Sequence, residues 1–280
     1  MSIGRCLTEW ELDGTVGLIF TLLTAGVGVA YLMAAELGRR RDRRPRRWPI
    51  TRSASFLAGL AVLLFAIDSG VGAQADSRLS AHMVEHMLIW LAAAPLLVGG
   101  APARLAFFAL ASPGRRRLAG ILRAGPLVAI TGPLWSTAIF TVVIVGTHLP
   151  AVYDLTLRND LVHVCEHAVY LISACLVWAP LIGADPLPHR PGPAARAACV
   201  IACMVPMGLV SLWLLLATAP VYAPYAHVLG PAAAVHDQRV AGVIMLAAGA
   251  PAFVTALVAR VGAWPHPRER YPPEELALRA

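Results

Sequence analysis

A short pattern of histidine and glutamate occurs twice in this chain, and these residues are the best suited to chemistry. The first copy, HMVEH, occupies residues 82–86, and the second, HVCEH, occupies residues 163–167. On a helix, residues three and four positions apart share a face, so the histidines and the glutamate of each copy project together. A metal ion held between imidazole and carboxylate groups is the chemistry that this spacing favours.

Both copies lie at the start of a long apolar segment, where buried imidazole and carboxylate groups are costly unless they are paired or coordinated. Because both motifs place such costly polar groups at matching positions of their segments, they suggest one shared site between two helices. The simpler alternative is that each set only hydrogen-bonds a neighbouring helix or interfacial water. The predicted metal ligands are His82, His86, His163 and His167.

Sulfur-containing side chains near these motifs favour copper as the ion, with zinc as the alternative. Thioether and thiolate sulfur select soft ions such as Cu(I), and Met83 and Cys165 each follow a histidine of a motif. They point away from part of the histidine face, so not all of these groups can bind one ion. Glu85 and Glu166 are expected to orient the histidines rather than bind the ion directly. Further residues that could complete the site are Asp68, His148, His236 and Asp237.

Two other functions use the same residues. HxxEH is the ligand spacing of one class of zinc metalloproteases, which gives a membrane-embedded zinc hydrolase as one alternative. Two copies on different spans fit this poorly, because one would be redundant. Histidines facing each other across a helical bundle also permit haem ligation, as in a membrane electron carrier, although haem does not need the doubled motif.

The composition indicates a polytopic membrane protein. The chain has 280 residues, 58% of them hydrophobic and 14% charged, with a mean hydropathy of +0.66. These values exclude an ordinary soluble domain. The formal net charge of +7 does not indicate a nucleic-acid partner, because the arginines cluster in alternate loops. The N-terminus lacks the basic region of a signal peptide, and we expect the first span to be retained.

Seven apolar segments predict an all-α bundle of seven transmembrane helices with the N-terminus outside and the C-terminus inside. This orientation places 19 arginines in inner segments and 4 in outer ones, as the positive-inside rule requires. Residues 1–262 form the predicted transmembrane domain and 263–280 a cytoplasmic tail. The apolar stretch LAFFALA, residues 105–111, is too short to span and is predicted to lie along the inner surface. The predicted spans are residues 15–37, 53–67, 81–98, 127–147, 161–182, 197–219 and 240–261.

Several stretches together resemble a known family. SAHMVEHMLIWLAAAPLLVGGAP, THLPAVYDLTLRNDLVHVCEHAVYL, APVYAPYA and DQRVAGVIM occur in this order and are similar to the seven-span CtaG-type cytochrome c oxidase assembly factors. The resemblance covers the third to seventh predicted spans. Two departures are Leu246 and Gly70, where the family often has tryptophan and proline. The matching motif positions here are His82, Met83, His86, His148, Pro150, Tyr153, His163, Glu166, His167, Tyr222, Asp237, Gln238, Gly242 and Met245.

This resemblance implies a non-enzymatic protein of the plasma membrane that assists copper insertion into the oxidase. Its implied partners are the lipid bilayer and cytochrome c oxidase subunits or copper chaperones, with no nucleic acid. The metal site would face outside. The oligomeric state is not set by the sequence.

The arginine distribution predicts which loops are accessible from outside. A cysteine placed at Ala75 should react with a membrane-impermeant thiol reagent in intact cells, whereas one placed at Gly114 should be protected. Labelling in broken cells, where both should react, is the control. Protection at residue 75 together with reaction at residue 114 would invert the topology.

Overall fold

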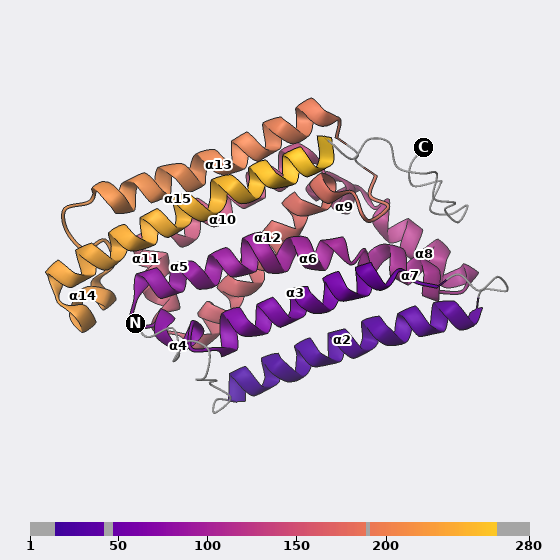
Figure 1. Ribbon diagram of the computed structural model, residues 1–280, viewed down its shortest axis with the longest axis horizontal. Helices are drawn as coiled ribbons and strands as arrows, with labels where there is room; N and C mark the ends of the chain where they lie inside the picture. The colour runs from indigo at the N-terminus through magenta and orange to yellow at the C-terminus, as the bar shows by residue number, and fades with distance from the viewer. Residues whose placement is uncertain (1–14, 42–46, 189–190, 262–280) are drawn as a thin grey trace.

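A computed structural model describes residues 15–41, 47–188 and 191–261, with side chains described from residue 17 to residue 249. All regular elements in these residues are helical, as the sequence predicts, and the long helices lie side by side in a bundle (Figure 1). The N-terminal acidic segment, part of the arginine run after the first span and the predicted tail lie outside the described residues. The long helices are α2 (Thr15–Arg41), α3 (Ile50–Asp68), α5 (Leu79–Leu88) continued by η1 (Ile89–Ala93) and α6 (Ala94–Gly99), α10 (Pro133–Thr147), α12 (Asp160–Ile182), α13 (Pro193–Leu216) and α15 (Pro231–Val261).

The length and hydropathy of these helices support a multi-pass membrane protein. Among the described residues, 5 helices are long and apolar enough to cross a membrane. A sixth span is present if α10 and the short helix α11 (Pro150–Thr156), which meet at 78°, count together. The helix α15, which corresponds to the predicted seventh span, is not among these candidates. The count of seven therefore stays a prediction.

The short helices gather at the two ends of the bundle. The helices α4 (Gly72–Ala75), α11 and α14 (Ala223–Leu229) lie at one end in Figure 1, whereas α7 (Pro102–Ala109), α8 (Ser112–Leu122) and α9 (Gly125–Ile130) lie at the other. Arg39, Arg40 and Arg41 end α2 at the second of these ends, where Arg41 Nη1 donates to the carbonyl of Ala109 (2.8 Å). Both HxxEH motifs begin near the opposite end.

The LAFFALA stretch forms most of α7, which packs against α2 with Leu105 and Phe107 buried. Its position along the inner membrane surface stays a prediction. Two other segments fold differently from the expectation drawn from the sequence. The predicted fourth span is divided, because Pro133 begins a new helix after α9. The outer loop that follows His148 contains α11, which folds back over the bundle and buries Tyr153.

The loop between α12 and α13 is tied to α7 by a partly buried carboxylate. Asp185 Oδ1 accepts a hydrogen bond from the backbone N–H of Arg104 at 2.8 Å. Burial raises the pKa of Asp185 to about 6, while the backbone N–H groups of Arg104 and Ala103 act in the opposite direction. This contact fixes the end of the bundle that lies away from the histidines.

A π-helical turn fixes how α12 packs against the helix of the first motif. In η1 the N–H of Ala94 donates to the carbonyl of Ile89, five residues earlier. By the same spacing the carbonyl of Trp90 would accept from residue 95, but Pro95 has no N–H, so this carbonyl is left without a partner in its own helix. The indole of Trp178 on α12 donates to that carbonyl at 2.8 Å. Because a backbone group in the apolar interior must be satisfied, this bond holds the two helices in register just below the histidines.

The helices α13 and α15 pack closely against each other at a glycine. A Cβ added at Gly242 would lie 2.9 Å from the carbonyl oxygen of Ser211 and 3.0 Å from Leu215. Small residues at such crossings allow helix backbones to pack tightly in membranes. The position of α15 therefore depends on this glycine.

We expect Gly242→Ala to lower the free energy of unfolding by about 1 to 3 kcal/mol, because the added methyl group overpacks a backbone contact. Thermal unfolding in detergent, followed by circular dichroism, measures this loss. The matched control is Gly26→Ala on α2, where an added Cβ meets nothing within 4 Å. The control should be neutral or stabilising by up to about 1 kcal/mol. Equal melting temperatures for the two variants would contradict the assigned contact.

Candidate metal centre

The two motifs are placed at matching depths by the starts of their helices. The side chain of Asn159 caps α12 by accepting from the backbone N–H groups of Leu161 and Val162 at 3.0 and 3.2 Å. The start of α5 is capped from another helix, because Asp237 on α15 accepts from Ser80 N–H at 3.1 Å and from Ser80 Oγ at 2.5 Å. Each motif thus falls within the first two turns of its helix.

The helices α5 and α12 bring all four predicted histidine ligands together. The ring centroids of His82 and His163 are 5.2 Å apart, and those of His86 and His167 are 5.7 Å apart. Within α5, the Nε2 atoms of His82 and His86 lie 3.0 Å from each other. Two nitrogen ligands of one tetrahedral zinc ion would be about 3.3 Å apart, so this spacing suits a shared ion.

The carboxylates of the motifs pair across the helix interface. Glu85 Oε1 of α5 lies 3.0 Å from His167 Nε2 of α12, and Glu166 Oε2 of α12 lies 3.8 Å from His82 Nε2 of α5. All four side chains are buried. Each motif therefore supplies a carboxylate to the other motif's imidazole, which links two segments of the chain into a single polar cluster.

Many polar atoms in this cluster are buried without a hydrogen-bond partner. They include both oxygens of Glu166, Oε2 of Glu85, and Nε2 of His163 and His167. The 3.0 Å contact between His167 and Glu85 is close, but it lacks the direction of a hydrogen bond. An unsatisfied polar atom in an apolar interior is costly, and so many together indicate that the cluster receives a further group.

The positions of the donor atoms suit a cation as that group. Among the described residues, two sets of donor atoms lie within 4.8 Å of one another: His82, His86 and Glu166 form one, and His82, Glu85 and His163 form the other. Both sets include His82, and both draw on α5 and α12. Two imidazoles with one carboxylate are a ligand set that transition metals accept.

Tyrosines enclose the cluster on the side of the short helices. Tyr153 of α11 lies 5.0 Å from the ring of His82 and stacks on Tyr222 at 4.0 Å. Tyr225 of α14 has its hydroxyl 3.1 Å from that of Tyr153, and it donates to the carbonyl of Ala75 at 2.8 Å. Burial raises the pKa of Tyr222 and Tyr225, which keeps both phenols protonated as donors.

A fourth tyrosine closes the opposite side. Tyr170 stacks on His86 with ring centroids 4.2 Å apart, and its hydroxyl is 2.6 Å from Thr147 Oγ1. The same hydroxyl lies 3.4 Å from Nδ1 of His148. His148 is buried beside the cluster and directs Nδ1 to the carbonyl of Ile144 at 2.8 Å. It belongs to neither set of donor atoms.

The other residues named from the sequence lie around the cluster in different roles. Asp68 is buried and accepts from Thr21 at 2.7 Å. Asp237 caps α5, whereas the side chain of His236 is exposed. Met83 is buried in the apolar core. Asp68, His236 and Asp237 belong to neither of the two donor sets.

Sequence reasoning from the motifs overlooked Tyr170 and Tyr225. Tyr170 follows His167 by three residues, so helix spacing already places the two on one face, and this signal could have found it. Nothing local to Tyr225 indicates its role, because α14 reaches the site only through the tertiary fold. Tyr153 and Tyr222 were among the motif positions that the family resemblance supplied.

The fold and this cluster define an all-α, multi-pass membrane protein with a buried histidine and glutamate centre shared by two helices. The family model of the cytochrome c oxidase caa3 assembly factor (Caa3_CtaG) matches residues 29–266. The chain therefore belongs to this family, which confirms the resemblance seen in the sequence.

Related proteins occur in mycobacteria. The chain is 31% identical over 196 residues to the uncharacterized proteins Mb0105 of Mycobacterium bovis and MT0111 of Mycobacterium tuberculosis, covering 68% of this chain and 29% of each relative. It is 25% identical over 273 residues to the uncharacterized protein ML1998 of Mycobacterium leprae, covering 94% of this chain and 40% of the relative. The chain thus spans less than half the length of these relatives. No solved structure matches it.

Proposed function

We propose that this protein binds copper at the histidine and glutamate centre and assists insertion of the metal into cytochrome c oxidase. The single observation that supports copper binding is the cluster of buried imidazole and carboxylate donors that lack hydrogen-bond partners. The family supports the link to the oxidase. Zinc is the alternative ion, because the same donor types bind both.

His82 is the central residue of the proposed site. It belongs to both donor sets, so one ion beside it can draw on ligands of both motifs at once, His86 and Glu166 together with His163 and Glu85. A carboxylate in each set neutralises part of the ion's charge in a region that water does not reach. Two overlapping sets suit a protein that receives an ion and passes it on, because the ion can exchange partners without leaving the centre.

The proposed orientation places this centre toward the outer face of the plasma membrane. The arginines that end α2 lie at the end of the bundle away from the motifs, and positively charged residues favour the cytoplasmic side. The site would therefore be reached from outside, through the layer formed by α4, α11 and α14. Cytochrome c oxidase subunits or copper chaperones are the proposed partners.

A shared centre predicts a particular metal stoichiometry. Substituting His82 and His86 by alanine, or His163 and His167 by alanine, should each abolish binding of Cu(II) or Zn(II) to the purified protein. The variant lacking all four histidines should be no worse, because the two pairs act on one ion. Elemental analysis after dialysis measures the bound metal.

The matched control is His227→Ala/His236→Ala, which removes two histidines that are exposed and outside the cluster. It should retain the full amount of metal. If each motif variant kept half of the metal instead, the chain would have two independent sites and the shared-site model would be wrong.

The proposed role predicts a defect in oxidase maturation. Cells lacking this protein should make oxidase polypeptide but little active enzyme, and excess copper in the medium should partly restore activity. A plasmid with the His82→Ala/His86→Ala variant should fail to complement, whereas His236→Ala should succeed. Oxidase activity with a reduced electron donor, set against immunoblots of the oxidase subunits, measures this. Normal activity in the deletion strain would count against the proposal.

A further inference from the structure

Methionines are concentrated beside the histidine centre, and the metal site proposed above includes none of them. The chain has 7 methionines. Met33 on α2 is 67% exposed on the outside of the bundle, and Met1 lies outside the described residues. The remaining methionines all lie in or against one buried cluster: Met83, Met87, Met204, Met207 and Met245.

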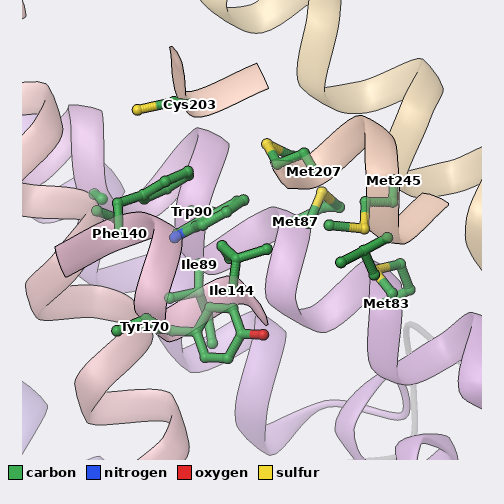
Figure 2. Close-up of a cluster of buried hydrophobic side chains, with 14 of the residues drawn as sticks. Met83, Met87, Ile89, Trp90, Phe140, Ile144, Tyr170, Cys203, Met207 and Met245 are labelled. Carbon is green, nitrogen blue, oxygen red and sulfur yellow. The ribbon is translucent and has the colours of Figure 1, made fainter. Parts of the chain in front are cut away.

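Four of these side chains come from three helices that pack together. Met83 and Met87 are one turn apart on α5, Met207 is on α13 and Met245 is on α15, and all are at most 7% exposed. Figure 2 shows them gathered in one region, beside the group formed by Trp90, Phe140 and Tyr170.

Specific contacts bring the three helices together at this point. The terminal methyl carbon of Met207 lies 2.8 Å from where a Cβ of Gly249 would be, and Gly249 is one turn beyond Met245 on α15. Hydrogen bonds between Ser80 of α5 and Asp237 of α15 hold these two helices together. Met87 follows Ser80 by seven residues on α5, and Met245 follows Asp237 by eight residues on α15. Met87 and Met245 are therefore at nearly the same depth.

The helix α5 carries two kinds of donor on adjoining faces. At about 100° per residue, His82 and His86 lie within about 40° of each other, Glu85 lies on one side of them, and Met83 and Met87 lie on the other. The carboxylate and imidazoles contact α12. The thioethers turn toward the side of the bundle where α15 packs.

Packing alone does not require methionine at these positions. Leucine has a similar volume and replaces methionine in cores at little cost. Thioether sulfur differs from leucine in being a soft, uncharged donor that selects Cu(I) over Cu(II) or zinc.

We propose that Met83, Met87, Met207 and Met245 form a second metal site, a thioether site for a soft monovalent cation of the Cu(I) type. It adjoins the histidine centre along α5 but shares no ligand with it. The site does not depend on metal binding by the histidines, so either proposal can fail alone.

Binding of Ag(I) tests this site, because Ag(I) is a soft monovalent cation that does not change oxidation state in air. Cysteine thiols also bind Ag(I), so every protein in this test has its five cysteines replaced by serine. The purified protein should then bind Ag(I), and His82→Ala/His86→Ala should still bind it. Met207→Leu/Met245→Leu should lose this binding while keeping Zn(II) binding at the histidines. Met33→Leu, which removes the lipid-facing methionine, should match the wild type. Isothermal titration in detergent, with chloride excluded from the buffer, measures each case.

A second measurement does not depend on substitution. In protein labelled with ¹³C at the methionine methyl groups, Ag(I) should shift the resonances of Met83, Met87, Met207 and Met245 and leave that of Met33 in place. Ag(I) binding that is lost in the histidine variant, or methyl resonances that do not move, would overturn the thioether site. A histidine variant that loses Zn(II) binding but keeps Ag(I) binding would support the thioether site.

Discussion

The pairing of the two HxxEH motifs across one helix interface is the constraint on which the rest of this structure depends. Glu85 faces His167 and Glu166 faces His82, so each helix needs the other to offset the cost of its own buried polar groups. Such groups are expensive in a bilayer, and neither α5 nor α12 could bury its motif alone. The contacts between α5 and α12 are therefore both the candidate site and a condition for the fold.

Other elements hold this interface by satisfying backbone and side-chain polar groups from neighbouring helices. The carbonyl freed by the π-turn at Trp90 accepts the indole of Trp178, and Asp237 supplies the cap that α5 lacks. The short helices α11 and α14 then cover the centre with tyrosines. Because these contacts use hydrogen bonds in an apolar setting, they fix the depth and register of the histidines more narrowly than apolar packing alone.

The helix α5 divides the bundle into two chemical environments. Its histidines and Glu85 face α12, whereas its methionines join those of α13 and α15. Imidazole and carboxylate groups are thereby separated from thioethers, although the two kinds of side chain alternate along a few residues of sequence. The close approach at Gly242 brings α13 within reach of α15, so this glycine helps to bring the methionines of the two helices together, although an added Cβ there would first meet Ser211, Leu214 and Leu215.

The sequence alone determined the all-α membrane class and the faces of the two motifs, because these depend on composition and on spacing within one helix. It also indicated the family, through the resemblance of its motif stretches. It also contained the Asn159 cap and the link from His167 to Tyr170. Only the tertiary structure decided that the glutamates pair crosswise, that Asp237 caps α5, that Tyr225 reaches the centre, and that four methionines meet. Each of these joins residues far apart in the chain, for example Ser80 with Asp237, and helical periodicity carries no information about which helices become neighbours. Side chains with the same spacing can face lipid or a partner helix, and packing makes that choice.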